Sequence, residues 1–207
     1  IEIDILDRAR READESGGRL RSSLEDRMGI DPGGKVLLFV GRLDHRKNIA
    51  FLFDVLRNLP LKERVDLVIV GEGPARSQLI EAAFERGVSR RVHFAGKQPF
   101  ETVARWYAAS DAFCFPSTVE TQGLVLVEAM AAGLPVVATD ISGNRDIVRD
   151  GENGYLVAPG DREMLAERIT RLIGEDALRG QMGARARASV RQRGWLMIAR
   201  QYLELYR

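Results

Sequence analysis

The sequence contains very little cysteine and histidine. Among its 207 residues there are one cysteine, Cys114, and two histidines. A single cysteine cannot form a disulfide within the chain, and one cysteine with two histidines falls short of a metal-binding cluster. We therefore expect no disulfide, no metal site and a reducing, cytoplasmic location for the protein.

A charge excess and a long apolar run are also lacking. Thirty-one Lys and Arg residues balance thirty Asp and Glu residues, for a formal charge of +1. A balanced chain has no overall basic field that would gather nucleic acid. The longest stretch without charge, residues 129–139, is far shorter than the roughly 20 apolar residues that cross a bilayer. We expect no nucleic-acid partner and no transmembrane span.

The chain has neither an initiator methionine nor the basic and apolar regions of a secretory signal at its start. We expect it to be a fragment of a longer protein. Its composition, 45% hydrophobic and 29% charged, is that of an ordinary globular domain. Its length predicts one large domain, or one domain with appendages.

Six short, nearly continuous apolar runs predict strands that are covered on both faces. They are residues 36–41, 66–71, 92–96, 112–116, 135–140 and 154–159. Segments with helical spacing alternate with them. These are residues 47–59, 74–86, 100–109, 123–132, 144–148 and 161–173. The alternation predicts an α/β fold with a doubly wound, Rossmann-like parallel sheet of about six strands.

Composition divides the chain into three regions. Residues 35–174 hold the alternating strands and helices. Residues 1–34 are rich in Arg, Asp and Glu and are predicted to be a linker with a short helix over 19–28. Residues 175–207 are predicted to form C-terminal helices, ending in an amphipathic segment, 195–206. In a doubly wound sheet the ligand binds at the carboxyl ends of the strands, so we expect the site in the loops that follow them.

The strongest local pattern is PSTVETQGLVLVEAMAAGLPVVATD. A predicted strand is followed by Glu120, a helix that starts near Gly123, and Glu128 about a turn and a half into that helix. Free amides at a helix start form an anion site, and glycine lets a phosphate approach closely. The two carboxylates would accept hydrogen bonds from neutral hydroxyls, such as those of a sugar and a ribose. The alternative is a capping or surface Glu120 and a solvated Glu128.

A second pattern, FVGRLDHRKN, places several cations after the first predicted strand. Charged donors there could neutralise a diphosphate from the side opposite the helix start. Arg42 and Lys47 are the main candidates, and His45 and Arg46 are weaker ones. The alternative is that these charges only keep the loop soluble.

Other features carry weaker predictions. Gly71-Glu72-Gly73-Pro74 lacks the third glycine of a dinucleotide fingerprint, so Gly73 either admits a ligand or belongs to a plain turn. His93 is expected to pack, or to bond to backbone, within a strand, and Cys114 is expected to be a buried, inert thiol. The basic C-terminal run is expected to be a solvated face, with an anionic membrane surface as the alternative partner. It comprises Arg179, Arg185, Arg187, Arg191 and Arg193.

The segments VGRLDHRKN, VIVGEGP, VHFAGK, the Glu-x7-Glu pair and EAMAAGLPVVATD occur in this order. Together they closely resemble the C-terminal half of glycosyltransferase family four, a group of retaining enzymes with the GT-B fold. The resemblance covers the chain from about residue 36 onward. It implies two Rossmann-like domains that face a cleft, with the nucleotide sugar held mainly by the C-terminal one.

The resemblance also implies roles for particular residues. Arg42 and Lys47 would contact the diphosphate, Glu120 the donor sugar and Glu128 the ribose hydroxyls. Other donor contacts would come from Gly73, Lys97, Gln98, Gly123 and Leu124. Among these, the loop with Lys97 and Gln98 resembles the one that recognises the nucleobase. No metal and no other cofactor are expected, because the cations and the helix start would neutralise the diphosphate.

The chain departs from the family pattern in three ways. Glu120-Thr121-Gln122-Gly123 replaces the common Glu-Gly-Phe-Gly, a variant associated with members that glycosylate lipids such as diacylglycerol. The family's Gly-Gly…Glu appears as Ser142-Gly143-Asn144-Arg145-Asp146, so that glutamate's role does not transfer to the shorter Asp146. The acceptor-binding N-terminal domain is not in this sequence, and the segment 195–206 resembles the helix that crosses back to it.

We therefore expect the donor-binding domain of a retaining glycosyltransferase. It would move a hexose from a nucleoside-diphosphate sugar, with UDP as the expected nucleotide, to an acceptor hydroxyl, with a lipid as one acceptor class. Glu120, Arg42 and Lys47 are the expected catalytic residues. Expected partners are the nucleotide sugar, the missing N-terminal domain and, for a lipid or glycolipid acceptor, a membrane surface. The alternatives are a GT-B-like nucleotide-sugar epimerase, a non-catalytic binding module and a dinucleotide-dependent dehydrogenase.

Overall fold

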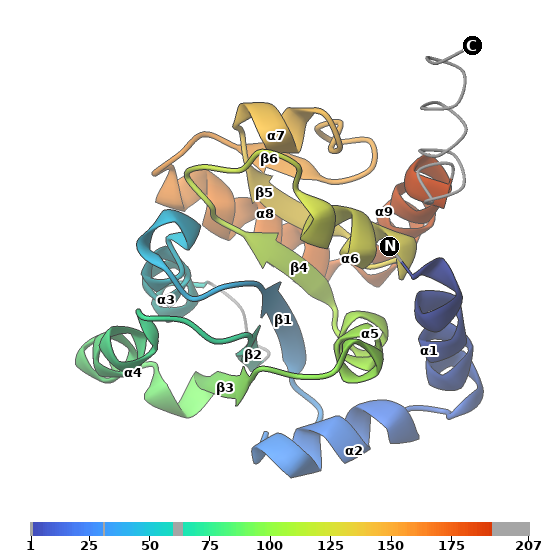
Figure 1. The fold of residues 1–207 in the computed structure, drawn as a ribbon, viewed down its shortest axis with the longest axis horizontal. Coiled ribbons are helices and arrows are strands. Elements are labelled where there is room, and N and C mark those ends of the chain that lie inside the picture. Colours follow the sequence, from blue (N-terminus) through green and yellow to red (C-terminus); the bar gives the residue numbers. More distant parts are fainter. Residues whose placement is uncertain (1, 31, 60–63, 192–207) are drawn as a thin grey trace, which may run out of the picture.

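The computed structural model describes residues 2–30, 32–59 and 64–191 of the chain. A parallel six-stranded sheet runs through this part, with strand order β3-β2-β1-β4-β5-β6 (Figure 1). The strands are β1 (Lys35–Val40), β2 (Val65–Val70), β3 (Val92–Gly96), β4 (Ala112–Phe115), β5 (Val136–Thr139) and β6 (Tyr155–Val157). Every predicted strand is present, and the predicted doubly wound α/β fold is confirmed.

Helices cover both faces of the sheet. One face carries three helices, α3 (Ala50–Arg57), α4 (Arg76–Glu85) and α8 (Arg162–Gly174), with α3 in contact with the other two. The other face carries α5 (Phe100–Ala109) and α6 (Leu124–Ala131), with α1 (Ile3–Glu15) and α2 (Arg19–Met28) packed outside them. Further along, α9 (Asp176–Val190) contacts both α6 and α8. The short elements are η1 (His45–Lys47), η2 (Ser89–Arg91) and α7 (Ser142–Arg145).

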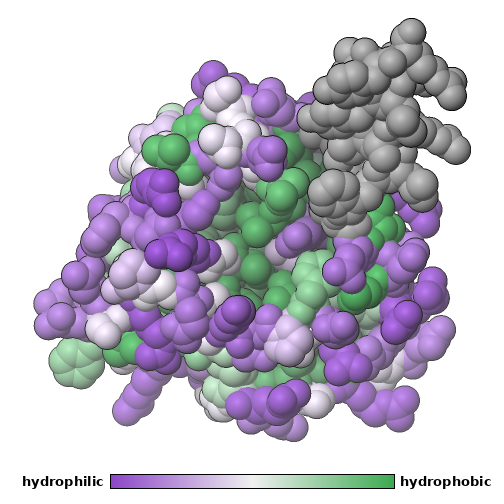
Figure 2. All heavy atoms as spheres, in the orientation of Figure 1, coloured by the Kyte–Doolittle hydropathy of each residue, from purple (hydrophilic) through white to green (hydrophobic). Residues whose placement is uncertain are grey.

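Burial on both faces explains why the strands are nearly continuous runs of apolar residues. All six residues of β2 are buried. Phe39, Phe113 and Phe115 stack across β1 and β4 at the centre of the sheet, with neighbouring ring centroids 6.0 Å apart. Cys114 is fully buried among them, as predicted. Hydrophilic residues dominate the surface in Figure 2, and apolar ones gather in the middle of that face, over β4 and α6.

Several local predictions are confirmed and others need correction. The helix over 19–28 is present, and the Asp161 side chain caps α8 by accepting from the Met164 amide at 2.9 Å. The predicted strand residue His93 bonds to the buried Asp66 carboxylate at 2.8 Å rather than to backbone. The segment 195–206 lies outside the described residues. Among the described helices, none is long and apolar enough to cross a membrane.

The linker predicted over residues 1–34 is wrong for residues 3–15, which form α1. Leu6 and Ala9 are buried and Ala13 is packed against the core. This spacing of three and four residues gives an apolar stripe that packs on α5. The stripe is narrow and is interrupted by charged residues, so periodicity alone did not reveal the helix. The division of the chain into three regions, with a linker from another domain, stays a prediction.

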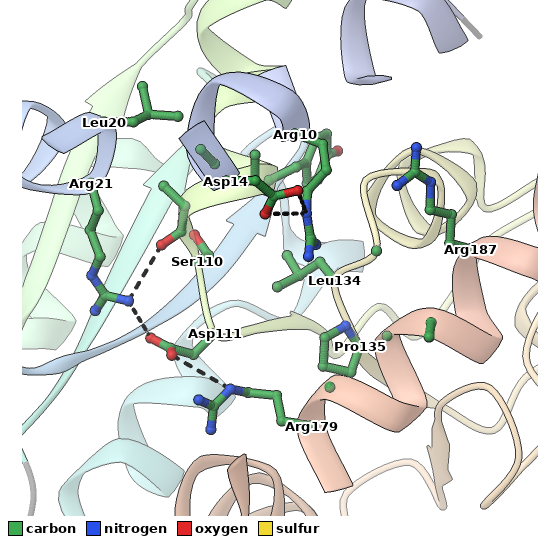
Figure 3. Close-up of a pocket in the computed structure, with 18 of the residues that line it drawn as sticks. Arg10, Asp14, Leu20, Arg21, Ser110, Asp111, Leu134, Pro135, Arg179 and Arg187 are labelled. Carbon is green, nitrogen blue, oxygen red and sulfur yellow. Dashed lines mark hydrogen bonds and ion pairs between the residues drawn. The ribbon is translucent and has the colours of Figure 1, made fainter. Parts of the chain in front are cut away.

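A buried carboxylate, Asp111, holds together the amino-terminal edge of the sheet, where the strands begin. It lies directly before β4. It accepts from Arg21 Nη1 at 2.7 Å and from the Val36 amide at 2.8 Å, and Arg179 lies 3.6 Å away. Figure 3 shows Asp111 between these two arginines, on the wall of a cavity of about 710 Å³. The carboxylate thereby joins α2, β1, β4 and α9.

Asp111→Ala should lower the free energy of unfolding by about 3 kcal/mol, because the buried Val36 amide loses its acceptor and the partly buried Arg21 loses one of the two carboxylates bound to it. Urea denaturation followed by circular dichroism measures this change. Asp14→Ala removes an exposed ion pair with Arg10 and is the control, with an expected loss below about 1 kcal/mol. Equal losses in the two variants would contradict the anchoring role of Asp111.

Cys114 should be unreactive in the folded chain. Burial raises the pKa of its thiol to about 12, so almost no thiolate forms at neutral pH, and no reagent reaches the side chain. Ellman's reagent should therefore label Cys114 only in the unfolded chain, which serves as the positive control. Rapid labelling under native conditions would contradict the burial of this residue.

Candidate functional site

The candidate site lies at the carboxyl ends of β1, β2 and β4. The sheet reverses its strand order at this place, because β1 lies between β2 and β4, and such switch points are where open α/β sheets bind ligands. Two cavities adjoin there, of about 260 and 410 Å³. Val40, Gly41 and Arg42 line both of them. The site is therefore formed by the loops in which the sequence predicted it.

The loop after β1 turns Lys47 into the smaller cavity. The Asp44 carboxylate accepts from the Arg46 amide at 3.0 Å, which caps the single turn of η1. Burial raises the pKa of Asp44, but bonding and charge from Arg46 outweigh this effect and lower it overall. Lys47 ends with its side chain only 18% exposed, and its Nζ lies 5.1 Å from the centre of the Phe115 ring.

Lys47 and Glu120 form an ion pair in this cavity. The Lys47 ammonium donates to Glu120 Oε2 at 2.7 Å, although 73 residues separate the two in sequence. The other oxygen, Oε1, accepts from the amides of Thr121 at 3.0 Å and Gln122 at 3.4 Å. Partial burial raises the pKa of Glu120, but the bond and charge of Lys47 lower it overall. Two of the three expected catalytic side chains are thus bound to each other.

Arg42 stands at the mouth of both cavities. Its side chain is 68% exposed, and its Nε lies 3.6 Å from the Asp44 carboxylate. An exposed guanidinium held only by a long contact is free to reorient toward an anion. His45 and Arg46 are also exposed, and neither lines the two cavities.

Contacts between three loops hold Glu120 in place, and the sequence did not reveal them. The Arg46 carbonyl accepts from the Ser117 hydroxyl at 3.1 Å and from the Thr118 amide at 2.8 Å. From the far side, the backbone of Gly143 packs on Glu120, because a Cβ at residue 143 would lie 2.4 Å from the Glu120 carbonyl oxygen. Serine, threonine and glycine are so common in loops that no pattern identifies such contacts.

The start of α6 borders the smaller cavity. Gly123 precedes the helix in a left-handed conformation, with φ of 54°. This conformation is accessible to glycine at little cost, and it orients the first turn. Leu124 lines the cavity and is 49% exposed. The first-turn amides of a helix have no intrahelical partner and favour an anion.

Glu128 lies deeper than the sequence suggested. It is one helical turn beyond Leu124 and does not line either cavity. Its Oε2 accepts from the hydroxyl of Tyr107, on α5, at 3.1 Å. Burial raises the pKa of Glu128, and the bond from Tyr107 lowers it by less, so the net shift is upward. Tyr107 was not among the predicted site residues, since an aromatic residue in an amphipathic helix is normally part of the core.

The larger cavity contains the other predicted donor contacts, with one exception. Lys97 and Gln98 line it, and Gln98 is anchored through its amide to the Ala95 carbonyl at 2.5 Å. Gly73 lies outside both cavities. A Cβ at this position would come within 2.3 Å of the Leu43 carbonyl oxygen. The close approach of two loops is by itself a reason for glycine at this position, and the donor contact expected at Gly73 stays a prediction.

Metal ligands do not gather in the described part of the chain, which holds no group of three His, Cys, Asp or Glu side chains placed to bind an ion. The chemistry that the site offers is electrostatic. It combines two cations, a helix start and a carboxylate around a cavity, an arrangement that suits an anion with hydroxyl groups attached.

Comparison with curated proteins places the chain among sugar-transferring enzymes. A phosphatidyl-myo-inositol mannosyltransferase of Mycobacterium leprae is 36% identical over 188 residues, which cover 89% of this chain and 50% of that protein. A D-inositol 3-phosphate glycosyltransferase of Frankia alni is 36% identical over 192 residues, covering 87% and 47%. The chain thus spans about half the length of these relatives.

Solved structures share the fold of this chain. HepE of Anabaena, solved with UDP and glucose, has a TM-score of 0.82 and 29% identity, covering 91% of this chain and 52% of that one. Sucrose-phosphate synthase of Thermosynechococcus elongatus has a TM-score of 0.80 and 32% identity, covering 89% and 48%. The family model described as glycosyl transferases group 1 matches residues 21–189. On this evidence the predicted kinship is confirmed, and the chain belongs to the glycosyl transferases group 1 family.

Proposed function

We propose that this chain is the donor-binding domain of a retaining glycosyltransferase that uses a nucleoside-diphosphate hexose. The observation that carries the proposal is the meeting of Lys47 and Glu120 in one cavity beside the start of α6. The acceptor hydroxyl would come from a domain outside this sequence, which spans about half of its relatives. The chain alone would bind the donor without completing transfer.

The diphosphate would take over the bonds that Lys47 now makes to Glu120. Arg42 would swing onto the same phosphates, and the first amides of α6 would approach them from the other side. In the transfer step, the bond from the anomeric carbon to the diphosphate oxygen breaks, a bond to the acceptor oxygen forms, and the proton of the acceptor hydroxyl passes to the departing diphosphate. Cations and amides that stabilise the leaving diphosphate lower the barrier, because its charge grows in the transition state. The proposal assigns this neutralisation to the protein, without a metal ion.

Glu120, once released by Lys47, would accept a hydrogen bond from a hydroxyl of the donor sugar. Glu128 would accept one from the ribose, and Lys97 and Gln98 would border the base. UDP is the proposed nucleotide, and the similarity to HepE, whose structure contains UDP and glucose, supports this choice. A polyol or lipid-linked hydroxyl is the proposed acceptor, which agrees with the name of the mycobacterial relative. For such a lipid, the enzyme would work at a membrane surface.

UDP should raise the melting temperature of the 207-residue chain, because a ligand that binds only the folded state adds about 2.7 kcal/mol of stability at a hundred times its Kd. Lys47→Ala should weaken UDP binding about tenfold or more, as expected when a charge-assisted hydrogen bond is lost. Added salt should reduce the difference between the two proteins, since it screens the charges. Differential scanning fluorimetry over a UDP titration measures both effects.

Lys35→Ala is the matched control for this experiment. Lys35 is partly buried, like Lys47, and also pairs with carboxylates. It lies at the amino end of β1, whereas Lys47 follows the carboxyl end of that strand. Its loss should lower the melting temperature without changing the response to UDP. If Lys47→Ala responds to UDP as the parent does, the phosphate site is not where we place it.

Glu120→Gln should bind UDP about threefold more tightly than the parent. In the parent, Lys47 must break its ion pair with Glu120 before it can bind a phosphate, and an ordinary ion pair contributes about 0.7 kcal/mol, which corresponds to this factor. The same variant should lose the preference for UDP-glucose over UDP, since the sugar hydroxyl loses its carboxylate acceptor. Isothermal titration calorimetry with both ligands checks the two effects together. Weaker UDP binding by Glu120→Gln would contradict the proposed exchange of partners at Lys47.

A further inference from the structure

Tyr107 and Glu128 form a contact between α5 and α6 that the proposed function does not use. The ring of Tyr107 is 1% exposed and packs at a tilt on Phe113, with the two centroids 5.7 Å apart. This packing fixes the direction of the hydroxyl, which points to Glu128 Oε2 at 3.1 Å. The hydroxyl lies 3.5 Å from the Val125 carbonyl, a distance at which a hydrogen bond is weak. Glu128 is therefore its main acceptor.

Glu128 has no other side-chain hydrogen bond or ion pair within the described part of the chain. Its second oxygen, Oε1, accepts no hydrogen bond from this part of the chain and is available to a ligand. A half-buried carboxylate with one bond is poorly stabilised, and burial pushes its pKa upward. The phenol opposes this shift. Its own pKa is raised well above the ordinary value by burial and by the neighbouring carboxylate, so it remains protonated and acts as a donor.

From this geometry we infer that Tyr107 is a positioning residue for ribose recognition, holding Glu128 Oε2 so that Oε1 accepts from a ribose hydroxyl. The inference rests on the proposed function. It assigns to α5 a part in donor binding that extends beyond the loops at the strand ends. Val103, one turn earlier on α5, lines the larger cavity, so the same face of this helix runs from the cavity down to Glu128.

Tyr107→Phe tests the inference, because it retains the ring in the core and removes only the hydroxyl. Binding of UDP should weaken about tenfold, the effect expected when a hydrogen bond to a charged group is lost. Binding of 2′,3′-dideoxyuridine 5′-diphosphate should not change, since this ligand lacks the hydroxyls that Glu128 would accept. Glu128→Gln should also weaken UDP binding, and adding Tyr107→Phe to it should have little further effect.

Tyr155→Phe is the matched control. Tyr155 is equally buried but lies on β6, at the far edge of the sheet, so its substitution should leave the binding of both nucleotides unchanged. A second measurement needs no ligand. Carbon NMR of the Glu128 carboxyl should show a higher pKa in Tyr107→Phe than in the parent, because the favourable donor is gone. UDP binding would then fail at a higher pH as the solution is acidified.

The outcomes separate the inference from the proposed function. If the parent chain binds UDP more tightly than the dideoxy analogue and Tyr107→Phe retains that preference, the inference is overturned and the proposed function stands. An equal loss for both nucleotides in Tyr107→Phe would show a purely structural tyrosine and would also overturn it. If the parent binds no nucleoside diphosphate, or binds both analogues equally, ribose recognition by Glu128 fails and the inference fails with it.

Discussion

Burial of the parallel sheet on both faces is the constraint on which the rest of the structure depends. In the middle of a strand covered by helices on each side, a charged side chain would be buried without water, so polar chemistry is displaced toward the two edges of the sheet where the strands begin and end. At the amino-terminal edge, Asp111 and its arginines hold strands and helices together. At the carboxyl edge, Lys47 and Glu120 occupy a cavity. The first edge serves stability, and the second is where we propose that the ligand binds.

The two edges contain different kinds of ion pair. Asp111 is bound by side chains and by the backbone amide of Val36, so it is part of the framework that fixes the start of the sheet. The pair of Lys47 and Glu120 joins two loops, and each partner has a second contact, Lys47 with the Phe115 ring and Glu120 with backbone amides. These contacts keep both side chains in position when the pair opens. In the proposed function, a diphosphate would then replace the carboxylate at Lys47 without the loops losing their shape.

Glu128 connects the site to the helical layer behind it. Burial and the Tyr107 hydroxyl act on its pKa in opposite directions, and burial has the larger effect. If Glu128 accepts from a ribose hydroxyl as we propose, its ability to do so at neutral pH depends on Tyr107, which stands behind it on α5. Helix packing between α5 and α6, fixed by the ring of Tyr107 against Phe113, contributes to the site in the same way as the loops around Glu120.

Much of the fold was determined by the sequence alone. Continuous apolar runs gave the six strands, and their alternation with helices gave the sheet and the edge that binds a ligand, because strands of one sense end together. The motifs around Arg42, Lys47, Glu120 and Gly123 also identified the family. Helix α1 was not predicted, because its stripe of Leu6, Ala9 and Ala13 lies among charges and has meaning only once α5 is there to cover it.

Only the tertiary structure decided which side chains meet. The bond between Lys47 and Glu120 spans 73 residues, and no periodicity reports a contact over that distance. The sequence placed Glu128 on a helix, but only the packing of α6 on α5 brought its carboxylate to the Tyr107 hydroxyl. The structure also showed that the backbone of Leu43 lies against Gly73, a contact that the sequence did not reveal. The sequence determines which polar residues follow each strand. Long-range packing determines which of these residues bind each other, and therefore which contacts a ligand would have to replace.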